Sequence, residues 1–239
     1  QKLFDKDYGE GVFTNLASIT DDPEEILSVT PTMDIALNGG IPEGSWVTLT
    51  GEPKTGKSVL ALTMAAEAQK QGRMVFYVDS EARFKKNKNL KIKGLDQSPT
   101  KFMFIHSTPE KIMSGVDYLN MVIKILETVP RAFVIIDSIS GLAERKELAE
   151  GVEAETRGNI NKKISSFCRC CAALVRVHKS IVVGITHRYA NTSGYGKHQL
   201  EKAGFAWKHQ RDVCLKIKSS VPWTLDTKRS FFGIKEIGR

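Results

Sequence analysis

The chain contains 239 residues, 41% of them hydrophobic, which is enough for one α/β domain with a sizeable core. No apolar run is long enough to span a membrane and no secretory signal pattern opens the chain, so neither a membrane-spanning nor a secreted protein is expected. Lys and Arg total 35 against 27 Asp and Glu. The resulting net charge of +8 is compatible with a polyanionic partner but does not require one.

The cysteines indicate a reducing compartment. Cys168, Cys170 and Cys171 cluster in a predicted helix without the spacing of metal ligands, and Cys214 is separate from them. We therefore interpret these side chains as buried or partly buried thiols.

Residues 1–30 are predicted to form an irregular lead-in segment, and residues 31–239 to form the core of the protein. At the start of the core, Thr32 is expected to cap a short helix over residues 33–37, which the sequence Asn38-Gly39-Gly40 ends.

From residue 46 onward, short apolar strands alternate with amphipathic helices. Helices are predicted over residues 57–71, 112–126 and 157–178. The predicted strands occupy residues 46–50, 74–78, 101–105, 132–136, 181–185, 213–217 and 231–234. This alternation predicts an α/β fold with a largely parallel central sheet flanked by helices on both faces.

Residues 51–58 match the G-x-x-x-x-G-K-[ST] pattern of a phosphate-binding loop. Its glycines let successive backbone N–H groups face phosphate oxygens, and the following helix adds the positive end of its dipole. Lys57 is expected to reach the β- and γ-phosphates, and the Ser58 hydroxyl to ligate Mg²⁺. A chance glycine-rich turn would not explain the flanking strand and helix. The predicted nucleotide-binding residues are Gly51, Glu52, Pro53, Lys54, Thr55, Gly56, Lys57, Ser58 and Val59.

Acidic residues follow two of the predicted strands. Asp137 ends an apolar strand, where it is expected to hold the water shell of Mg²⁺, although an ordinary capping aspartate is the alternative. Asp79 and Glu81 follow the strand over residues 74–78, which we expect beside the strand of the phosphate loop. Either acid could orient and deprotonate the attacking water, and Asp79 could instead cap the next turn.

His187 follows the strand over residues 181–185 and is a candidate for contacting the γ-phosphate, with an ordinary hydrogen-bonded histidine as the alternative. The next segment, residues 189–198, mixes aromatic, glycine and basic residues. That composition suits a single nucleic-acid strand, and a plain surface loop is the competing interpretation. Lys162, Arg169 and Arg176 lie seven residues apart on the preceding helix. Their stripe is either a solvated face or a contact for a phosphate backbone.

These motifs, in this order, resemble the RecA family of recombinases, and most closely its phage UvsX-type branch. Residues 32–44 resemble the family's approach to the phosphate-loop strand, residues 78–81 the strand end with the catalytic glutamate, and residues 136–138 the Walker B segment. Residues 185–187 resemble the strand end that carries the γ-phosphate sensor, which is Gln in RecA itself and His in the UvsX-type branch. The resemblance covers about residues 8–235 and favours Glu81 over Asp79.

The resemblance implies a RecA-type P-loop core and a role for each motif. Glu81, Lys57 and His187 would be catalytic, and Ser58 and Asp137 would hold the metal. Residues 144–155 and 188–204 would be the two DNA-binding loops. The implied DNA-binding residues are Lys162, Arg169, Arg188, Tyr189, Tyr195 and Lys197, and the implied contacts to a neighbouring subunit's nucleotide are Lys208 and Lys235.

Three features depart from the family pattern. The second loop ends in Lys202-Ala203-Gly204 where the family has Gly-Gly. Little sequence precedes Tyr8, so the N-terminal polymerisation element is expected to be short or missing. The chain stops at Arg239 without room for a C-terminal duplex-binding domain, as expected of a shortened chain or a minimal recombinase.

The resemblance implies an ATP-dependent DNA recombinase, a DNA-dependent ATPase that uses ATP and Mg²⁺. Its expected partners are single-stranded and duplex DNA and further copies of itself, in a helical filament or alternatively a ring, and no membrane. The expected location is the cytoplasm of a bacterium or of a phage-infected cell. A DnaB-type hexameric helicase motor is one alternative. A regulatory RecA-like paralogue is another, and the intact Lys57, Glu81 and Asp137 argue against it.

Overall fold

The computed structural model describes residues 2–14, 24–84, 92–150, 159–190, 199–201, 203–218, 223–224 and 236–238. Within these ranges, no helix combines the length and the apolar character needed to cross a bilayer.

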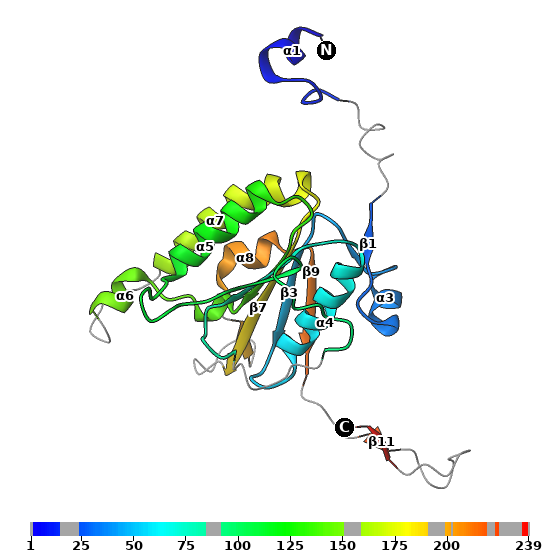
Figure 1. Cartoon of the computed structure of the whole chain (residues 1–239), viewed down its shortest axis with the longest axis vertical. Coiled ribbons are helices and arrows are strands. Elements are labelled where there is room, and N and C mark those ends of the chain that lie inside the picture. The colour runs from blue at the N-terminus through cyan, green and yellow to red at the C-terminus, as the bar shows by residue number, and fades with distance from the viewer. Residues whose placement is uncertain are drawn as a thin grey trace.

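A central parallel sheet organises the molecule (Figure 1). Its strands lie side by side in the order β5-β4-β6-β7-β3-β9, and each neighbouring pair is parallel. The strands are β3 (Trp46–Gly51), β4 (Val75–Asp79), β5 (Phe102–Ile105), β6 (Phe133–Asp137), β7 (Ile181–Ala190) and β9 (Val213–Ile217). A short strand, β8 (Gln199–Glu201), pairs antiparallel with the end of β7. The predicted α/β fold with a largely parallel sheet is confirmed.

The order of the strands corrects one expectation. Strand β4 does not lie beside β3, because β6 and β7 are inserted between them. The neighbours of β3 are β7 and β9. Glu81, which follows β4, therefore reaches the phosphate loop only across the ends of two other strands.

Helices cover both faces of the sheet, as Figure 1 shows. On one face, α5 (Gly115–Thr128), α7 (Asn159–Val177) and α8 (Gly204–Gln210) pack over a core that includes Phe76, Val134 and Trp207. On the other face, α4 (Lys57–Lys70) covers a second core. Successive residues of a strand point to opposite faces, and because both faces are covered, strands β3 and β4 are buried along their whole length.

Several local details differ from the sequence predictions. The first core helix, α3 (Pro31–Ala36), is capped by Thr30 rather than Thr32, because Pro31 fits the first helical position. The lead-in contains a helix, α1 (Lys2–Tyr8), and a strand, β1 (Ile26–Leu27), which pairs with β2 (Ile41–Pro42). Helix α8 (Gly204–Gln210) has no counterpart among the predicted helices. The predicted strand over 231–234 lies outside the described residues. The described residues on either side of it form two short paired strands, β10 (Trp223–Thr224) and β11 (Glu236–Gly238).

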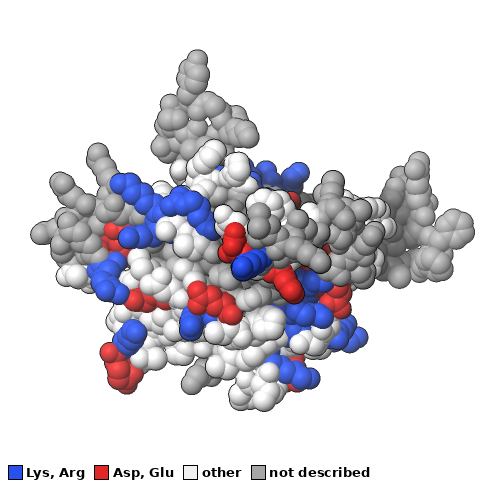
Figure 2. Space-filling model, turned by 90° about the horizontal axis from the view of Figure 1, so that it is seen from above, with Lys and Arg blue, Asp and Glu red and all other residues white. Residues whose placement is uncertain are grey.

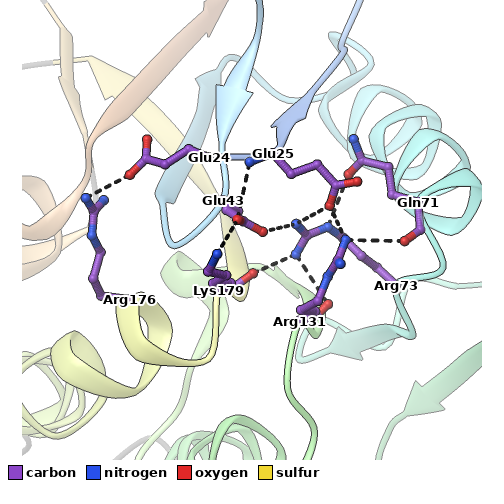
Figure 3. A network of polar contacts seen from close by, with 8 residues as sticks. All are labelled: Glu24, Glu25, Glu43, Gln71, Arg73, Arg131, Arg176 and Lys179. Atoms are coloured by element: carbon purple, nitrogen blue, oxygen red, sulfur yellow. Dashed lines mark hydrogen bonds and ion pairs between the residues drawn. The ribbon is translucent and has the colours of Figure 1, made fainter. Parts of the chain in front are cut away.

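A network of charged side chains joins the lead-in to the amino edge of the sheet (Figure 3). At its centre, the Arg73 guanidinium is fully buried and donates to Glu43 Oε2 at 2.9 Å and to the Lys179 carbonyl at 2.6 Å. Glu43 also pairs with the Lys179 ammonium at 3.3 Å. The other members of the network are Glu24, Glu25, Gln71, Arg131 and Arg176.

Candidate active site

The phosphate-binding loop lies at the carboxyl edge of the sheet, between β3 and α4. Gly51 ends β3 so close to β9 that a Cβ atom there would lie 2.4 Å from the Ile217 carbonyl oxygen, which no other residue tolerates. Gly56 has a φ of +90°, in the left-handed region that glycine adopts without strain. The loop therefore requires glycine at both positions, and its backbone leads directly into the helix that begins at Lys57.

Lys57 spans the loop from inside. Its ammonium donates to the carbonyl of Glu52 at 2.6 Å and to that of Gly51 at 3.2 Å, and the residue is 5% exposed. Burial lowers the pKa of Lys57, while the negative charges of Asp137 and Glu81 oppose the shift. An ammonium group held in this way can exchange loop carbonyls for phosphate oxygens. The loop side chains at Glu52, Pro53 and Lys54 are exposed, as is Val59 on the helix.

Ser58, at the start of α4, and Asp137, at the end of β6, bring together two side chains whose oxygen atoms could bind a metal. The Ser58 hydroxyl donates to Asp137 Oδ2 at 2.6 Å, and the Tyr77 hydroxyl donates to the same oxygen, also at 2.6 Å. Burial raises the pKa of Asp137, and these two hydrogen bonds oppose the shift.

The Ser58 hydroxyl and the Asp137 carboxylate suit Mg²⁺, and they are too few to hold a metal that has only protein ligands. Among the described residues, no group of three or more His, Cys, Asp or Glu side chains is arranged to hold a metal. Mg²⁺ is commonly bound through one or two protein oxygens, with water and substrate phosphates completing the shell. The residues present are therefore suited to a metal that arrives with a nucleotide.

Glu81 and His187 meet at this edge, although Glu81 follows β4 and His187 lies on β7, and these two strands are not adjacent. Nε2 of His187 donates to Glu81 Oε1 at 2.7 Å, the Ser138 hydroxyl donates to the same oxygen, and Arg83 pairs with Oε2 at 3.0 Å. The hydrogen bond from His187, together with those other contacts, lowers the pKa of Glu81 to about 2 against the opposing effect of burial. Glu81 is thus held ionised. Nδ1 of His187 is buried with no hydrogen-bond partner among the described residues.

Asp79 caps the turn that follows β4. Its carboxylate accepts from the backbone N–H groups of Arg83 at 3.2 Å and Phe84 at 2.9 Å. This is the capping arrangement that the sequence left open for Asp79. Of the two acids, Glu81 is therefore the better candidate for the base, because its carboxylate is not used in capping and contacts His187.

The loop, the acids and the histidine enclose one cavity of about 460 Å³. Its lining includes Lys57, Ser58, Glu81, Asp137 and His187. Four separate strand ends contribute these side chains, which is the usual location of a ligand site in a parallel α/β sheet.

The residues predicted to bind DNA are more dispersed. Lys162 and Arg169 are exposed on α7, and Arg169 donates to Ser165 at 2.9 Å. Arg176, further along the stripe, pairs with Glu24 at 2.9 Å near the amino edge, the opposite end from the cavity. Among the described residues on the face drawn in Figure 2, basic side chains lie in several groups, with acidic side chains between and beside them.

The two predicted loops are described only in part. In the first, residues 145–150 form the short helix α6, and residues 151–155 lie outside the described part. In the second, Arg188 lies on β7 with Tyr189, which is 50% exposed. Tyr195, Lys197 and Lys235 lie outside the described residues. Lys208 is half-buried on α8, next to Trp207, whose indole N–H donates to Thr48 of β3 at 2.9 Å.

The contacts of Glu201 near the second loop could not be predicted from the sequence. Glu201, on β8, accepts from the Thr186 hydroxyl at 3.0 Å and pairs with Arg211 at 2.9 Å. Thr186 immediately precedes His187. Strand β8 is thus attached to the part of β7 that enters the cavity. The local sequence gives no signal for this contact.

The fold and this edge define a P-loop α/β domain: a glycine-rich loop before a helix, a hydroxyl and a carboxylate for a metal, and an acid that faces a polar side chain of another strand. The family model of the RecA N-terminal domain matches residues 1–228. The chain therefore belongs to the RecA family.

Similar curated proteins agree with this assignment. "Protein RecA" of Nautilia profundicola is 26% identical, with 91% of this chain and 61% of the relative covered. "Protein RecA" of Oleidesulfovibrio alaskensis is 28% identical, with 96% of this chain and 64% of the relative covered. This chain thus spans about three fifths of the length of these relatives.

Proposed function

We propose that the chain is the ATPase core of a DNA recombinase, with ATP and Mg²⁺ as cofactors. In this proposal the protein assembles as a helical filament on single-stranded DNA and promotes pairing and strand exchange with duplex DNA. Family membership supports the proposal, and His187 at the sensor position favours the UvsX-type branch. Residues 31–239 would form the ATPase core and residues 1–30 the lead-in segment.

The observation that carries the proposal is the contact between Glu81 and His187 inside the phosphate-loop cavity. His187 lies on β7, the strand that continues into the hairpin of the second loop. A side chain that touches both the acid and the approach to the loop can couple events at the nucleotide to that loop.

The loop residues would bind the triphosphate. Backbone N–H groups of residues 51–56 and the start of α4 would receive the phosphates, and Lys57 would exchange its loop carbonyls for phosphate oxygens. Ser58 and Asp137 would hold Mg²⁺, which when bound neutralises charge on the phosphates.

Glu81 would orient and deprotonate the attacking water. With a pKa of about 2 it is a weak base while His187 donates to it. If His187 turned its N–H to the γ-phosphate, the largest cause of that low pKa would be removed, and Glu81 would become more basic. ATP binding would in this way activate the acid and move the strand end that carries the loop.

The DNA contacts would come from the α7 stripe and from the two loops. Lys162, Arg169, Arg188, Tyr189, Tyr195 and Lys197 would contact the DNA strand through charge and stacking. A neighbouring copy would complete the nucleotide site with Lys208 and Lys235.

The test is ATP turnover with and without single-stranded DNA, for the wild type and for Glu81→Gln. We expect DNA to stimulate the wild type, and Glu81→Gln to lower kcat by about 100-fold or more while ATP affinity stays the same, because the amide cannot accept a proton. Turnover that is indifferent to DNA would rule out the recombinase assignment. An unchanged rate in Glu81→Gln would remove its role as base.

Electron microscopy of the complex with DNA and a slowly hydrolysed ATP analogue distinguishes the modes of assembly. Open helical filaments are expected. Closed six-membered rings would instead identify a helicase motor of the DnaB type.

A further inference from the structure

Tyr77 is a residue of the cavity to which neither the sequence motifs nor the family assignment gives a role. It lies on β4, is 2% exposed, and lines the same cavity as Lys57 and Asp137. Its ring is packed among other aromatic rings, with centroid distances of 5.4 Å to Phe84 and 5.7 Å to Phe104. This packing fixes the ring, so its hydroxyl has a defined position.

That hydroxyl is directed at the carboxylate proposed to hold the metal. It donates to Oδ2 of Asp137 at 2.6 Å, the same oxygen that accepts from Ser58 at 2.6 Å. The two donors come from different elements, β4 and α4, and they converge on one atom. A carboxylate that accepts two hydrogen bonds on one oxygen can no longer rotate freely about its terminal bond.

These two hydrogen bonds orient the Asp137 carboxylate for Mg²⁺. Groups that hydrogen-bond to a metal-binding carboxylate set its orientation, and removing such a group commonly lowers metal affinity by a factor of about 10 to 100. With Oδ2 occupied by the two hydroxyl groups, Oδ1 is left to accept a hydrogen bond from metal-bound water. The site is then oriented before the metal arrives.

We infer that Tyr77 is a positioning residue for Mg²⁺, acting through Asp137. The inference rests on the proposed function, because it requires that Ser58 and Asp137 hold a metal that enters with ATP. It goes beyond that function in assigning a magnesium-specific role to a buried tyrosine.

The substitution Tyr77→Phe tests this inference, because it removes the hydroxyl and keeps the ring and its packing. Tyr118→Phe is the matched control. Tyr118 is also buried, at 4% exposed, and its hydroxyl bonds to Ser107 and to the Asp79 carbonyl rather than to Asp137.

The measurement is the affinity for a fluorescent ATP analogue as a function of Mg²⁺ concentration, and again in EDTA. For Tyr77→Phe we expect the half-saturating Mg²⁺ concentration to rise about tenfold, with unchanged affinity in EDTA and an unchanged far-ultraviolet circular dichroism spectrum. Tyr118→Phe should match the wild type in each readout.

Three outcomes would overturn the inference. A Tyr77→Phe protein with the wild-type Mg²⁺ dependence would show that the hydroxyl does not position the carboxylate. An equal loss of affinity with Mg²⁺ and in EDTA would assign Tyr77 to packing alone. If the wild type itself bound the analogue independently of Mg²⁺, the proposed metal site would fail, and the inference would fail with it.

Discussion

At the scale of single residues, Glu81 shows how hydrogen bonds set the charge of the proposed catalytic acid. Its side chain is 11% exposed, and contacts with His187, Ser138 and Arg83 hold it ionised. A carboxylate with a lowered pKa stabilises the folded protein at pH values above its unfolded value. That contribution is lost as the pH falls toward the folded value.

Acid denaturation tests this directly. The pKa of Glu81 is about 2 in the folded protein against an ordinary value of 4.5, so its contribution is present above pH 4.5 and lost between pH 4.5 and pH 2. From pH 5 to pH 3, the free energy of unfolding of the wild type should fall by about 2 kcal/mol more than that of Glu81→Gln. Urea denaturation at pH 5, 4 and 3 measures the difference. Parallel losses in the two proteins would show that Glu81 has an ordinary pKa.

Part of this chemistry could be predicted from the sequence. Lys57, Glu81, Asp137 and His187 each follow an apolar strand, and the carboxyl ends of parallel strands share one edge. The role of Tyr77 could not be predicted, because its contact with Asp137 joins residues 60 positions apart. In the sequence, Tyr77 is indistinguishable from the apolar residues around it in β4.

At the scale of elements, the hairpin of β7 and β8 is the part of the second loop whose attachment can be seen. Glu201 holds it by accepting from Thr186 and pairing with Arg211, which follows α8. The Glu201 and Arg211 side chains are 12% and 22% exposed, so the pair is more shielded than an ordinary surface ion pair. Strand β8 is therefore held both to β7, next to His187, and to the end of α8.

Glu201→Gln should loosen this hairpin. Because hydrogen bonds to charged groups are stronger than neutral ones, we expect hydrogen-exchange protection of the amides in residues 186–190 and 199–201 to fall about tenfold. Glu127→Gln is the control, since its carboxylate pairs with Lys124 at 3.6 Å on the surface. Equal protection in the two variants would contradict the attachment.

Two features of the fold, helix α8 and the position of β4 in the sheet, have no signal in the local sequence. Helix α8 has only seven residues, and Trp207 is its one fully buried side chain, so no hydrophobic period is visible. The position of β4, away from β3, is a property of the sheet rather than of either strand. By contrast, β4 and β6 are predictable from the sequence, because burial on both faces leaves continuous apolar runs over residues 75–78 and 133–136.

At the scale of the whole molecule, the network around Arg73 joins segments distant in the sequence at the amino edge of the sheet (Figure 3). The Arg73 and Glu43 side chains are 0% and 5% exposed. The cavity lies at the opposite, carboxyl edge. The network is therefore expected to affect stability without direct effects on the chemistry.

Arg73→Met tests the contribution of the network. Removing one partner leaves Glu43 with a buried, poorly compensated charge, so the free energy of unfolding should fall by about 3–5 kcal/mol. Lys70→Met removes a surface pair with Glu67 and should change it by less than about 1 kcal/mol. Urea denaturation at neutral pH measures both. An Arg73→Met protein as stable as Lys70→Met would show that the network is dispensable.

In the proposed function, a triphosphate in the loop cavity strengthens the binding of the two distant loops to DNA. Fluorescence anisotropy of a labelled single-stranded oligonucleotide measures this, with Mg²⁺ present and with or without a slowly hydrolysed ATP analogue. We expect the analogue to tighten DNA binding by about tenfold or more, within the usual range of coupling between two sites. Equal affinity under the two conditions would contradict it.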